Sequence, residues 1–137
     1  MTDCIFCKIA SNEIPANKLY ESENFIVFLD ISPANKGHAL IVPKIHAQSL
    51  TDLPEHVAQE FGELQLRVSK AVMQSTNAEG FNLLLNDGRA AGQEVMHAHM
   101  HIMPRFSTDD FHFKWTHKKY GEGEMQEYFE RIKTNLA

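Results

Sequence analysis

The chain has 137 residues, which predicts one domain that can bury a hydrophobic core without the help of disulfides. Its formal net charge of −5 argues against a nucleic-acid partner, which needs a basic surface, but permits a small anionic ligand held by local dipoles. No apolar run approaches the roughly 20 residues that cross a bilayer, and the N-terminus lacks the features of a secretory signal. We therefore expect a cytoplasmic protein with no membrane partner.

The first half of the chain predicts a short helix and an antiparallel pair of strands. The helix is expected over residues 4–10, and a short strand follows over 18–21. Phe25–Asp30 and His38–Pro43 are compact apolar runs rich in strand-forming residues, with turn residues between them. These two runs are therefore expected to pair with each other.

The second half predicts the main helix, two more strands and a C-terminal helix. Residues 55–76 carry apolar side chains at spacings of three and four, which places them on one helical face. They are Val57, Phe61, Leu64, Val68, Ala71 and Val72. Strands are expected over 81–86 and 98–104, and a helix with one apolar face is expected over 123–136. The apolar residues of that helix are Met125, Tyr128, Phe129 and Ile132. Elements in this order predict an α+β domain with an antiparallel sheet.

The most informative segment is Ala91–Arg105, in which three histidines alternate with apolar residues. His97, His99 and His101 share one face if the segment is a strand, because strand side chains alternate between two faces. Three interpretations follow from these residues alone. The rings are surface or hydrogen-bonded histidines, or they hold a catalytic zinc with a further ligand, or one of them is a nucleophile that attacks phosphorus.

The segment resembles the signature of the histidine triad (HIT) superfamily, in which three histidines alternate with apolar residues. His97–Met103 matches all seven positions. Other motifs match the bacterial branch of the family, namely Cys4–Cys7, Ile14-Pro15, Phe28–Pro33, Gly37-His38, Val42–Lys44, His46, Asn86–Gly88 and Ala91–Gln93. The resemblance covers Cys4 to Arg105 and implies one HIT domain over 1–137, with 106–137 as a C-terminal extension. It also implies a five-stranded antiparallel sheet with one long helix and a C-terminal helix.

The resemblance implies that the chain binds a nucleotide and cleaves the bond at its α-phosphorus through a nucleotidyl-histidine intermediate. In that scheme His99 is the nucleophile, and His101 contacts the phosphate and helps to protonate the leaving group. His38 supports the triad from a neighbouring strand, and Asp30 accepts the ribose hydroxyls. The remaining implied contacts are those of Phe6 and Ile31 with the base, and of Asn86, Gly92, Gln93 and the backbone N–H of Val95 with the phosphate.

The expected substrate is a purine nucleoside phosphoramidate such as adenosine 5'-phosphoramidate. Imidazole titrates near pH 6.5, so a neutral nucleophile and a protonated neighbour are expected together, and the chemistry requires no cofactor. Hydrolysis of dinucleoside polyphosphates, nucleotidyl transfer, and nucleotide binding by a non-catalytic adaptor stay as alternatives. Two departures from the family pattern are Glu94, where some branches have a hydroxyl residue, and Phe111–Trp115, which lacks the eukaryotic Trp-Pro-Pro ending.

Cys4 and Cys7 are the only cysteines, and by themselves they are consistent with a metal site or with buried reduced thiols. A redox pair would be expected beside a βαβ unit, which the predicted elements lack. The resemblance to metal-bearing bacterial HIT proteins adds His46 and His97, and two thiolates with two imidazoles make a closed, structural zinc site. The resemblance to the HIT family also implies a two-fold homodimer formed through the main helix and one edge strand.

Overall fold

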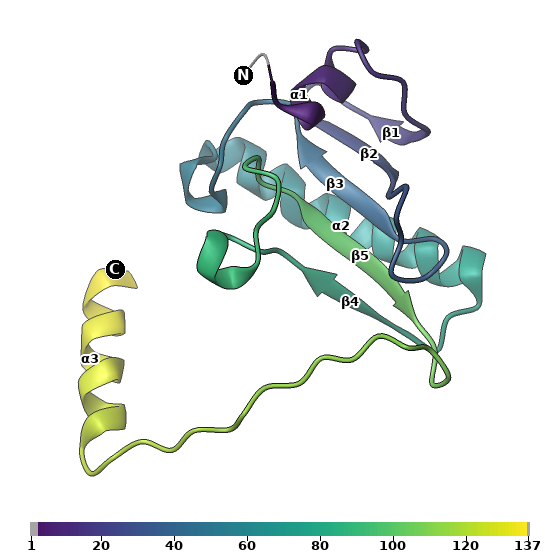
Figure 1. Ribbon diagram of the computed structural model, residues 1–137. Coiled ribbons are helices and arrows are strands. Elements are labelled where there is room, and N and C mark those ends of the chain that lie inside the picture. Colours follow the sequence, from purple (N-terminus) through teal and green to yellow (C-terminus); the bar gives the residue numbers. More distant parts are fainter. Residues whose placement is uncertain (1–2, 137) are drawn as a thin grey trace.

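The computed structural model describes residues 3–136, and its central feature is one antiparallel sheet of five strands (Figure 1). The strands are β1 (Lys18–Glu21), β2 (Phe25–Leu29), β3 (Ala39–Pro43), β4 (Gly80–Leu84) and β5 (Met100–Arg105). Their order is β1-β2-β3-β5-β4, so β5 lies between β3 and β4. The predicted α+β fold with a five-stranded antiparallel sheet is confirmed.

The long helix α2 (Glu55–Thr76) covers one face of the sheet. It follows Pro54, which lacks an N–H that a helix start would leave unpaired, and it ends at Asn77 in the left-handed conformation. Its apolar stripe and the sheet form the main core, which contains Phe25, Val27, Ala39, Ile41, Val57, Phe61, Leu64, Val68, Val72 and Ile102. Ala71 was predicted on this stripe but is exposed, because it lies at the stripe's margin.

The short helix α1 (Ile5–Ala10) lies on the opposite face and makes a second, smaller core over β2 and β3. That core contains Phe6, Ile9, Ile26, Phe28, Leu40 and Val42. In the register of β3 with β5, Leu40 pairs with His101, so both side chains lie on this face. The histidines of the triad strand therefore lie next to the second core and away from α2.

The strand that carries the triad begins at Met100, two residues later than predicted. The backbone N–H of Ala98 donates to the carbonyl of Ala47 (2.7 Å), and that of His97 donates to the carbonyl of Val95 (2.8 Å). The first bond connects the segment to the loop after β3, and the second is a local turn, so only His101 of the three histidines lies within β5. The other predicted elements agree to within two residues at each end, and short 3₁₀ helices over 50–52 and 89–91 were not predicted.

After β5 the chain leaves the sheet as an extended arm, which we define as residues 111–121, and ends in α3 (Glu124–Leu136). Figure 1 shows α3 standing apart from the sheet. The predicted helix is confirmed, but its apolar side chains are exposed rather than packed on the domain. Among residues 3–136, no helix combines the length and the apolar character needed to cross a bilayer.

Candidate active site and metal site

The ring of His99 is oriented by a backbone carbonyl. Its Nδ1 lies 2.7 Å from the carbonyl oxygen of His97, and the side chain is 6% exposed. A carbonyl oxygen only accepts, so Nδ1 carries the proton and donates it, and Nε2 keeps a free lone pair. The ring centroid lies 5.0 Å from that of Phe6 and 4.9 Å from that of His101. His99 is therefore an oriented imidazole, and in its neutral form the Nε2 lone pair is the kind of group that attacks phosphorus.

The tautomer of His101 is set by its neighbour His38. The backbone N–H of Ala34 donates to Nδ1 of His38 (3.0 Å), so the proton of the neutral His38 ring is on Nε2. This Nε2 lies 2.9 Å from Nδ1 of His101 and donates to it. Nε2 of His101 therefore carries the remaining proton and is a hydrogen-bond donor. His38, predicted to support the triad, is brought into direct contact with it.

The free site does not contain the protonated histidine that the sequence led us to expect. Burial, together with the nearby His99 and His38 rings, lowers the pKa of His101 to about 4, although Asp30 acts in the opposite direction. Burial also lowers the pKa of His38, again against the effect of Asp30. At neutral pH both rings are uncharged, and His101 donates through its tautomer and not through a positive charge.

Acidification is expected to destabilise the protein through His101, by about 2 kcal/mol between pH 6.5 and pH 4. The pKa of His101 is about 4 in the folded chain and 6.5 in the reference state, so in this window the unfolded chain binds a proton that the folded chain does not. Stability is complete above pH 6.5 and is lost as the pH falls. Urea unfolding across this range should show a shallower pH dependence for His101→Gln than for wild type or for His56→Gln. Identical slopes for all three proteins would show that His101 does not have this depressed pKa.

The residues predicted to bind the nucleoside lie beside the triad. Asp30 is half-buried directly after β2, and its Oδ2 lies 3.8 Å from Nε2 of His38. Its Oδ1 accepts a hydrogen bond from the backbone N–H of Ser32 (2.8 Å), which orients the carboxylate. Ile31 is 97% exposed and free to cover a planar ring, whereas Phe6 is buried with its ring edge against His99.

The loop before the triad presents free backbone N–H groups. Gly88 and Gly92 both have φ of 90°, a conformation that side chains disfavour and glycine adopts freely. Within residues 3–136, the N–H groups of Glu94, Val95 and Met96 donate no backbone hydrogen bond. Successive free N–H groups make a concavity that binds anions. This arrangement fits the predicted contact of the Val95 N–H with phosphate.

Gln93 holds this loop in place. Its side chain is 4% exposed, and its Oε1 accepts from the N–H of Gly88 (2.8 Å). Its Nε2 donates to the carbonyls of Gln48 (2.9 Å) and Val95 (3.1 Å). Both amide protons are in use, so the side chain has none left for a phosphate oxygen. Gln93 therefore positions the loop, and the phosphate contact expected from the sequence would require one of these hydrogen bonds to be exchanged.

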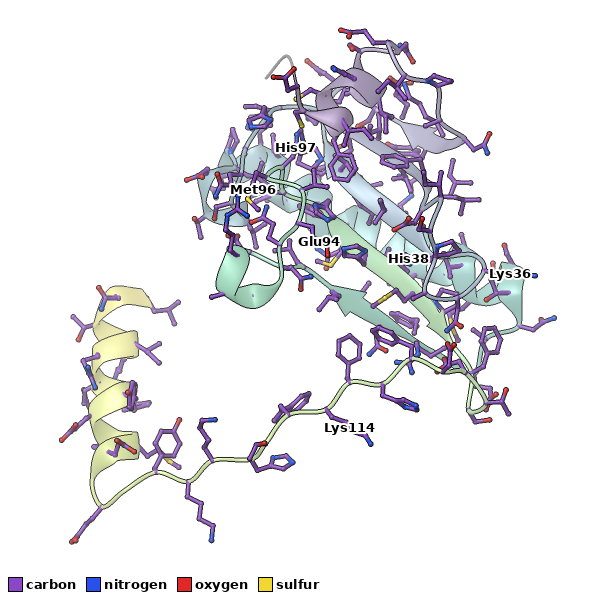
Figure 2. All side chains as sticks on the ribbon, in the orientation of Figure 1. Lys36, His38, Glu94, Met96, His97 and Lys114 are labelled. Atoms are coloured by element: carbon purple, nitrogen blue, oxygen red, sulfur yellow. The ribbon has the colours of Figure 1, made fainter. Side chains whose placement is uncertain are left out.

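Asn86 and Glu94 border the same region. Nδ2 of Asn86 donates a long, weak hydrogen bond to the carbonyl of Gly92 (3.4 Å). Little hydrogen-bond energy would be lost if Nδ2 donated to a phosphate oxygen in place of this carbonyl. Figure 2 shows Glu94 on the side of the sheet that carries His38 and His97. Glu94, where the chain departs from the family pattern, is exposed and lies between Gly92 and the triad.

Four side chains predicted as metal ligands converge from three segments. Sγ of Cys4 lies 3.3 Å from Nδ1 of His97, and Sγ of Cys7 lies 3.3 Å from Nδ1 of His46 and 3.6 Å from Nδ1 of His97. Tetrahedral zinc with sulfur at 2.3 Å and nitrogen at about 2.05 Å requires S···N separations of about 3.6 Å. The four ligand atoms lie within 4.8 Å of one another, so these residues could hold one metal ion.

The surroundings of the cluster favour a metal ion over bare thiols. Nε2 of His97 donates to the carbonyl of Pro43 (2.7 Å), which leaves Nδ1 with its lone pair toward the sulfurs. Burial and the adjacent Cys4 raise the pKa of the Cys7 thiol, so without a cation this thiol stays protonated at neutral pH. A divalent metal would deprotonate it and satisfy both sulfurs.

The cluster and His99 are connected through two contacts. His97 supplies a ring nitrogen to the cluster and a carbonyl oxygen to His99. Phe6 lies between Cys4 and Cys7 in the sequence, and its ring packs edge-on against both His97 (5.8 Å between centroids) and His99 (5.0 Å). An ion that holds the cluster together would therefore also hold the ring of His99 in place.

Several contacts that organise the site had no signal in the sequence. The N–H of Ala34 and the carbonyl of Pro43 are backbone groups, which every residue carries, and only the folded chain shows which histidine each one meets. A second unpredicted feature is the ion pair of Arg105 with Asp109 (2.8 Å and 2.9 Å) where the chain leaves β5. Its only sequence signal is the spacing of four residues.

The HIT domain family model matches residues 11–108. The adenosine 5'-monophosphoramidase HNT1 of Saccharomyces cerevisiae is 43% identical over 74% of this chain and 62% of its own length. A crystal structure of a HIT-family member from Bacillus subtilis is 36% identical, with a TM-score of 0.92 over 98% of both chains. A zinc-bound histidine triad family protein from Mycobacterium smegmatis is 34% identical, with a TM-score of 0.75 over 98% of both chains.

The likeness to the Bacillus subtilis structure includes the arm and α3. Residues 106–136 make up nearly a quarter of the chain, and a TM-score of 0.92 is not reached unless they too superpose. The family model covers residues 11–108, which include the triad, the loop before it and all five strands of the sheet. On these grounds the chain belongs to the HIT family, whose members include nucleotide-binding hydrolases.

Proposed function

We propose that this chain hydrolyses purine nucleoside phosphoramidates through a nucleotide bonded to His99. The observation that carries the proposal is the proton arrangement of the triad. His99 presents a lone pair at Nε2, and the adjacent His101 presents an N–H. The Nε2 of His99 can attack phosphorus while the N–H of His101 binds the leaving-group side of the same phosphoryl group. The likeness to a yeast adenosine 5'-monophosphoramidase supports the substrate class.

The reaction proceeds in two displacements. An anionic substrate favours uptake of a solvent proton by His101, and Asp30, 3.8 Å from His38, stabilises the added charge. Nε2 of His99 forms a bond to the α-phosphorus while the phosphorus–nitrogen bond breaks, and His101 gives its proton to the leaving amine. Water then attacks phosphorus, the bond to His99 breaks, and His101 takes the proton that the water loses. The free N–H groups at 94–96 stabilise the charged phosphoryl oxygens.

We also propose that Cys4, Cys7, His46 and His97 bind a structural zinc ion. The S···N distances and the free Nδ1 of His97 support this, as does the zinc-bound relative from Mycobacterium smegmatis. When bound, the ion would tie α1 to the sheet, and four protein ligands would leave no position for catalytic water.

The quaternary state that we propose is a two-fold homodimer through α2 and the edge strand β4. An uncovered sheet edge invites pairing with another chain. β4 is an edge strand, and its Phe81 and Leu83 are 43% and 41% exposed. Leu66 of α2 is 59% exposed, so the helix as well as the strand offers apolar surface.

A turnover assay without added divalent metal tests the proposed function. The purified chain should release ammonia and AMP from adenosine 5'-phosphoramidate faster than it cleaves a diadenosine polyphosphate. Faster cleavage of the polyphosphate would favour the second substrate class. Transfer of AMP to added phosphate in preference to water would identify a nucleotidyltransferase. Nucleotide binding without turnover of any of these compounds would contradict an enzyme and favour the adaptor.

Asp30→Asn is expected to lower kcat/KM for the phosphoramidate by about 10- to 100-fold, because a charged acceptor for the ribose hydroxyls is lost. For wild type, kcat/KM should fall by a similar factor when the 2',3'-dideoxy substrate replaces the normal one. For Asp30→Asn the same replacement should lower kcat/KM little further, because the variant and the dideoxy substrate remove the same interaction. Asp110→Asn, on an exposed residue outside the site, is the matched control. If the variant and the dideoxy substrate each lowered kcat/KM independently, so that their effects added, Asp30 would not contact the ribose.

A further inference from the structure

The hydrogen bond between His38 and His101 can run in either of two directions. Nε2 of His38 and Nδ1 of His101 are 2.9 Å apart, so in the uncharged pair one ring donates and the other accepts. If His38 donates, the proton of His101 is on Nε2 and is free for a substrate. If His101 donates, its Nε2 is a bare lone pair. The direction of this one bond therefore decides whether His101 offers an N–H to a leaving group.

The backbone N–H of Ala34 selects the first direction. It lies 3.0 Å from Nδ1 of His38 and requires a lone pair on that nitrogen. In the second direction Nδ1 of His38 would carry a proton, so two donors would face each other and the hydrogen bond would be lost. Within residues 3–136, this N–H is the one hydrogen-bond partner of Nδ1 of His38. The position of the Ala34 N–H therefore determines where the protons of both rings lie.

Ala34 lies in the turn 32–37 between β2 and β3, which has neither helix nor strand to hold it. Figure 1 shows this turn beside the end of β5. The side chain of Asn35 fastens it there, because Nδ2 donates to the carbonyl of Pro104 (2.9 Å) and to Oδ2 of Asp109 (2.9 Å). Both amide protons of Asn35 are in use, so this side chain ties the turn to the strand that carries His101.

The carboxylate that receives Asn35 is itself fixed. Arg105 donates to both oxygens of Asp109 (2.8 Å and 2.9 Å), the N–H of Phe106 donates to Oδ2 (3.0 Å), and the Asp109 side chain is 5% exposed. The hydrogen bonds from Arg105 hold the pKa of this carboxyl far below its usual range, so the acceptor stays ionised. Hydrogen bonds to an ionised acceptor are stronger than those between neutral groups. Asn35 is therefore anchored to a rigid point of the fold.

We propose that Asn35 is a positioning residue of the triad. By holding the turn 32–37 on β5 it keeps the Ala34 N–H on Nδ1 of His38, and this keeps an N–H of His101 directed at the leaving group. Its own carbonyl accepts from the backbone N–H of His38 (3.1 Å), which fixes the backbone of that histidine as well. The side chain of Asn35 acts through Ala34 and His38, because its hydrogen bonds go to β5 and Asp109. The effect on turnover rests on the proposed function, whereas the proton arrangement does not.

Nitrogen NMR of the full-length chain with labelled histidine rings tests the proton arrangement in the absence of substrate. Wild type should carry a proton on Nε2 of His101 and none on Nδ1 of His38. Asn35→Ala should add a second population with a proton on Nδ1 of His38 and none on Nε2 of His101. Lys36→Ala changes an exposed residue of the same turn and should give the wild-type spectrum. An unchanged proton arrangement in Asn35→Ala, or a proton on Nδ1 of His38 in wild type, would overturn the proposal.

A backbone change keeps the test valid if Asn35→Ala does not fold. Replacement of Ala34 by its α-hydroxy analogue, lactic acid, converts the N–H to an ester oxygen and leaves every side chain in place. It should produce the same second population, since the donor that selects the tautomer is gone. A wild-type proton arrangement in this ester would show that the Ala34 N–H does not select the tautomer, which also overturns the proposal.

Turnover shows whether the proton arrangement serves the reaction. Both changes should lower kcat for the phosphoramidate by about 10-fold, a part of the roughly 10²- to 10⁴-fold that a positioned proton donor contributes. KM should change little, because the His101 N–H meets the leaving group. A shifted proton arrangement with full kcat would contradict the positioning role. A wild-type chain that has the expected ring protons but does not turn over would contradict the proposed function alone.

Discussion

His99→Ala is expected to lower kcat for the phosphoramidate by about 10⁴- to 10⁶-fold, the range typical of a lost nucleophile. The free lone pair at Nε2 is the only group that the mechanism uses to attack phosphorus, and water lacks the orientation that the His97 carbonyl gives to the ring. Nucleotide affinity should stay within a few-fold of wild type. The groups that we propose hold the ribose and the phosphate oxygens lie on other segments, at Asp30 and at the loop 88–96.

Two controls make this result specific. His56→Ala removes an exposed histidine of α2 and should leave turnover unchanged. His99→Gly leaves space for free imidazole, which should restore cleavage in a concentration-dependent way by attacking phosphorus in place of the missing ring. His99→Ala with more than about a tenth of wild-type kcat would show that another group is the nucleophile.

The second large effect is expected from loss of a metal ligand. Cys4→Ser should remove bound zinc and lower the free energy of unfolding by about 3 kcal/mol, which corresponds to roughly 10 °C in Tm for a domain of this size. It should also reduce kcat, because Phe6 and the His97 carbonyl that position His99 are attached to the cluster. Metal content per chain, thermal unfolding and turnover of the same sample are the measurements.

His46→Gln and His56→Gln form the matched pair for this prediction. His46 lies at the cluster, and His56 lies on the outside of α2, so only His46→Gln should lose zinc and stability. A chelator added to wild type should reproduce the effect of Cys4→Ser. A wild-type chain that is purified without metal and unfolds at the same temperature after zinc is added would refute the structural site.

The sheet, the main helix and the composition of the site could be predicted because they depend on local patterns. Continuous apolar runs over 25–29 and 39–43 form β2 and β3, and spacings of three and four over 55–76 form α2. The alternation of three histidines also places them on one side of the domain. The motif resemblance then identified the side chains that the structure brings together at the site and at the cluster.

The unpredicted features depend on contacts between distant segments. Which ring nitrogen of His99 or His101 carries a proton depends on a carbonyl or on a neighbouring histidine. The pKa of His101 depends on burial, which a single strand does not specify. Gln93 was assigned to the phosphate from its motif, whereas Gly88 and Gln48 occupy its amide group. The periodicity of α3 predicted an apolar stripe but contained no information about which molecule covers it.

The central claim is that Nε2 of His99 bonds to the nucleotide during turnover. A single-turnover reaction with adenosine 5'-phosphoramidate, quenched in alkali to preserve histidine–phosphorus bonds, should yield a peptide containing residue 99 that carries one adenylyl group. Peptide mass spectrometry should locate that group on His99. An adenylyl group found on another residue, or rapid turnover with no adduct on His99 at any time point, would contradict the account.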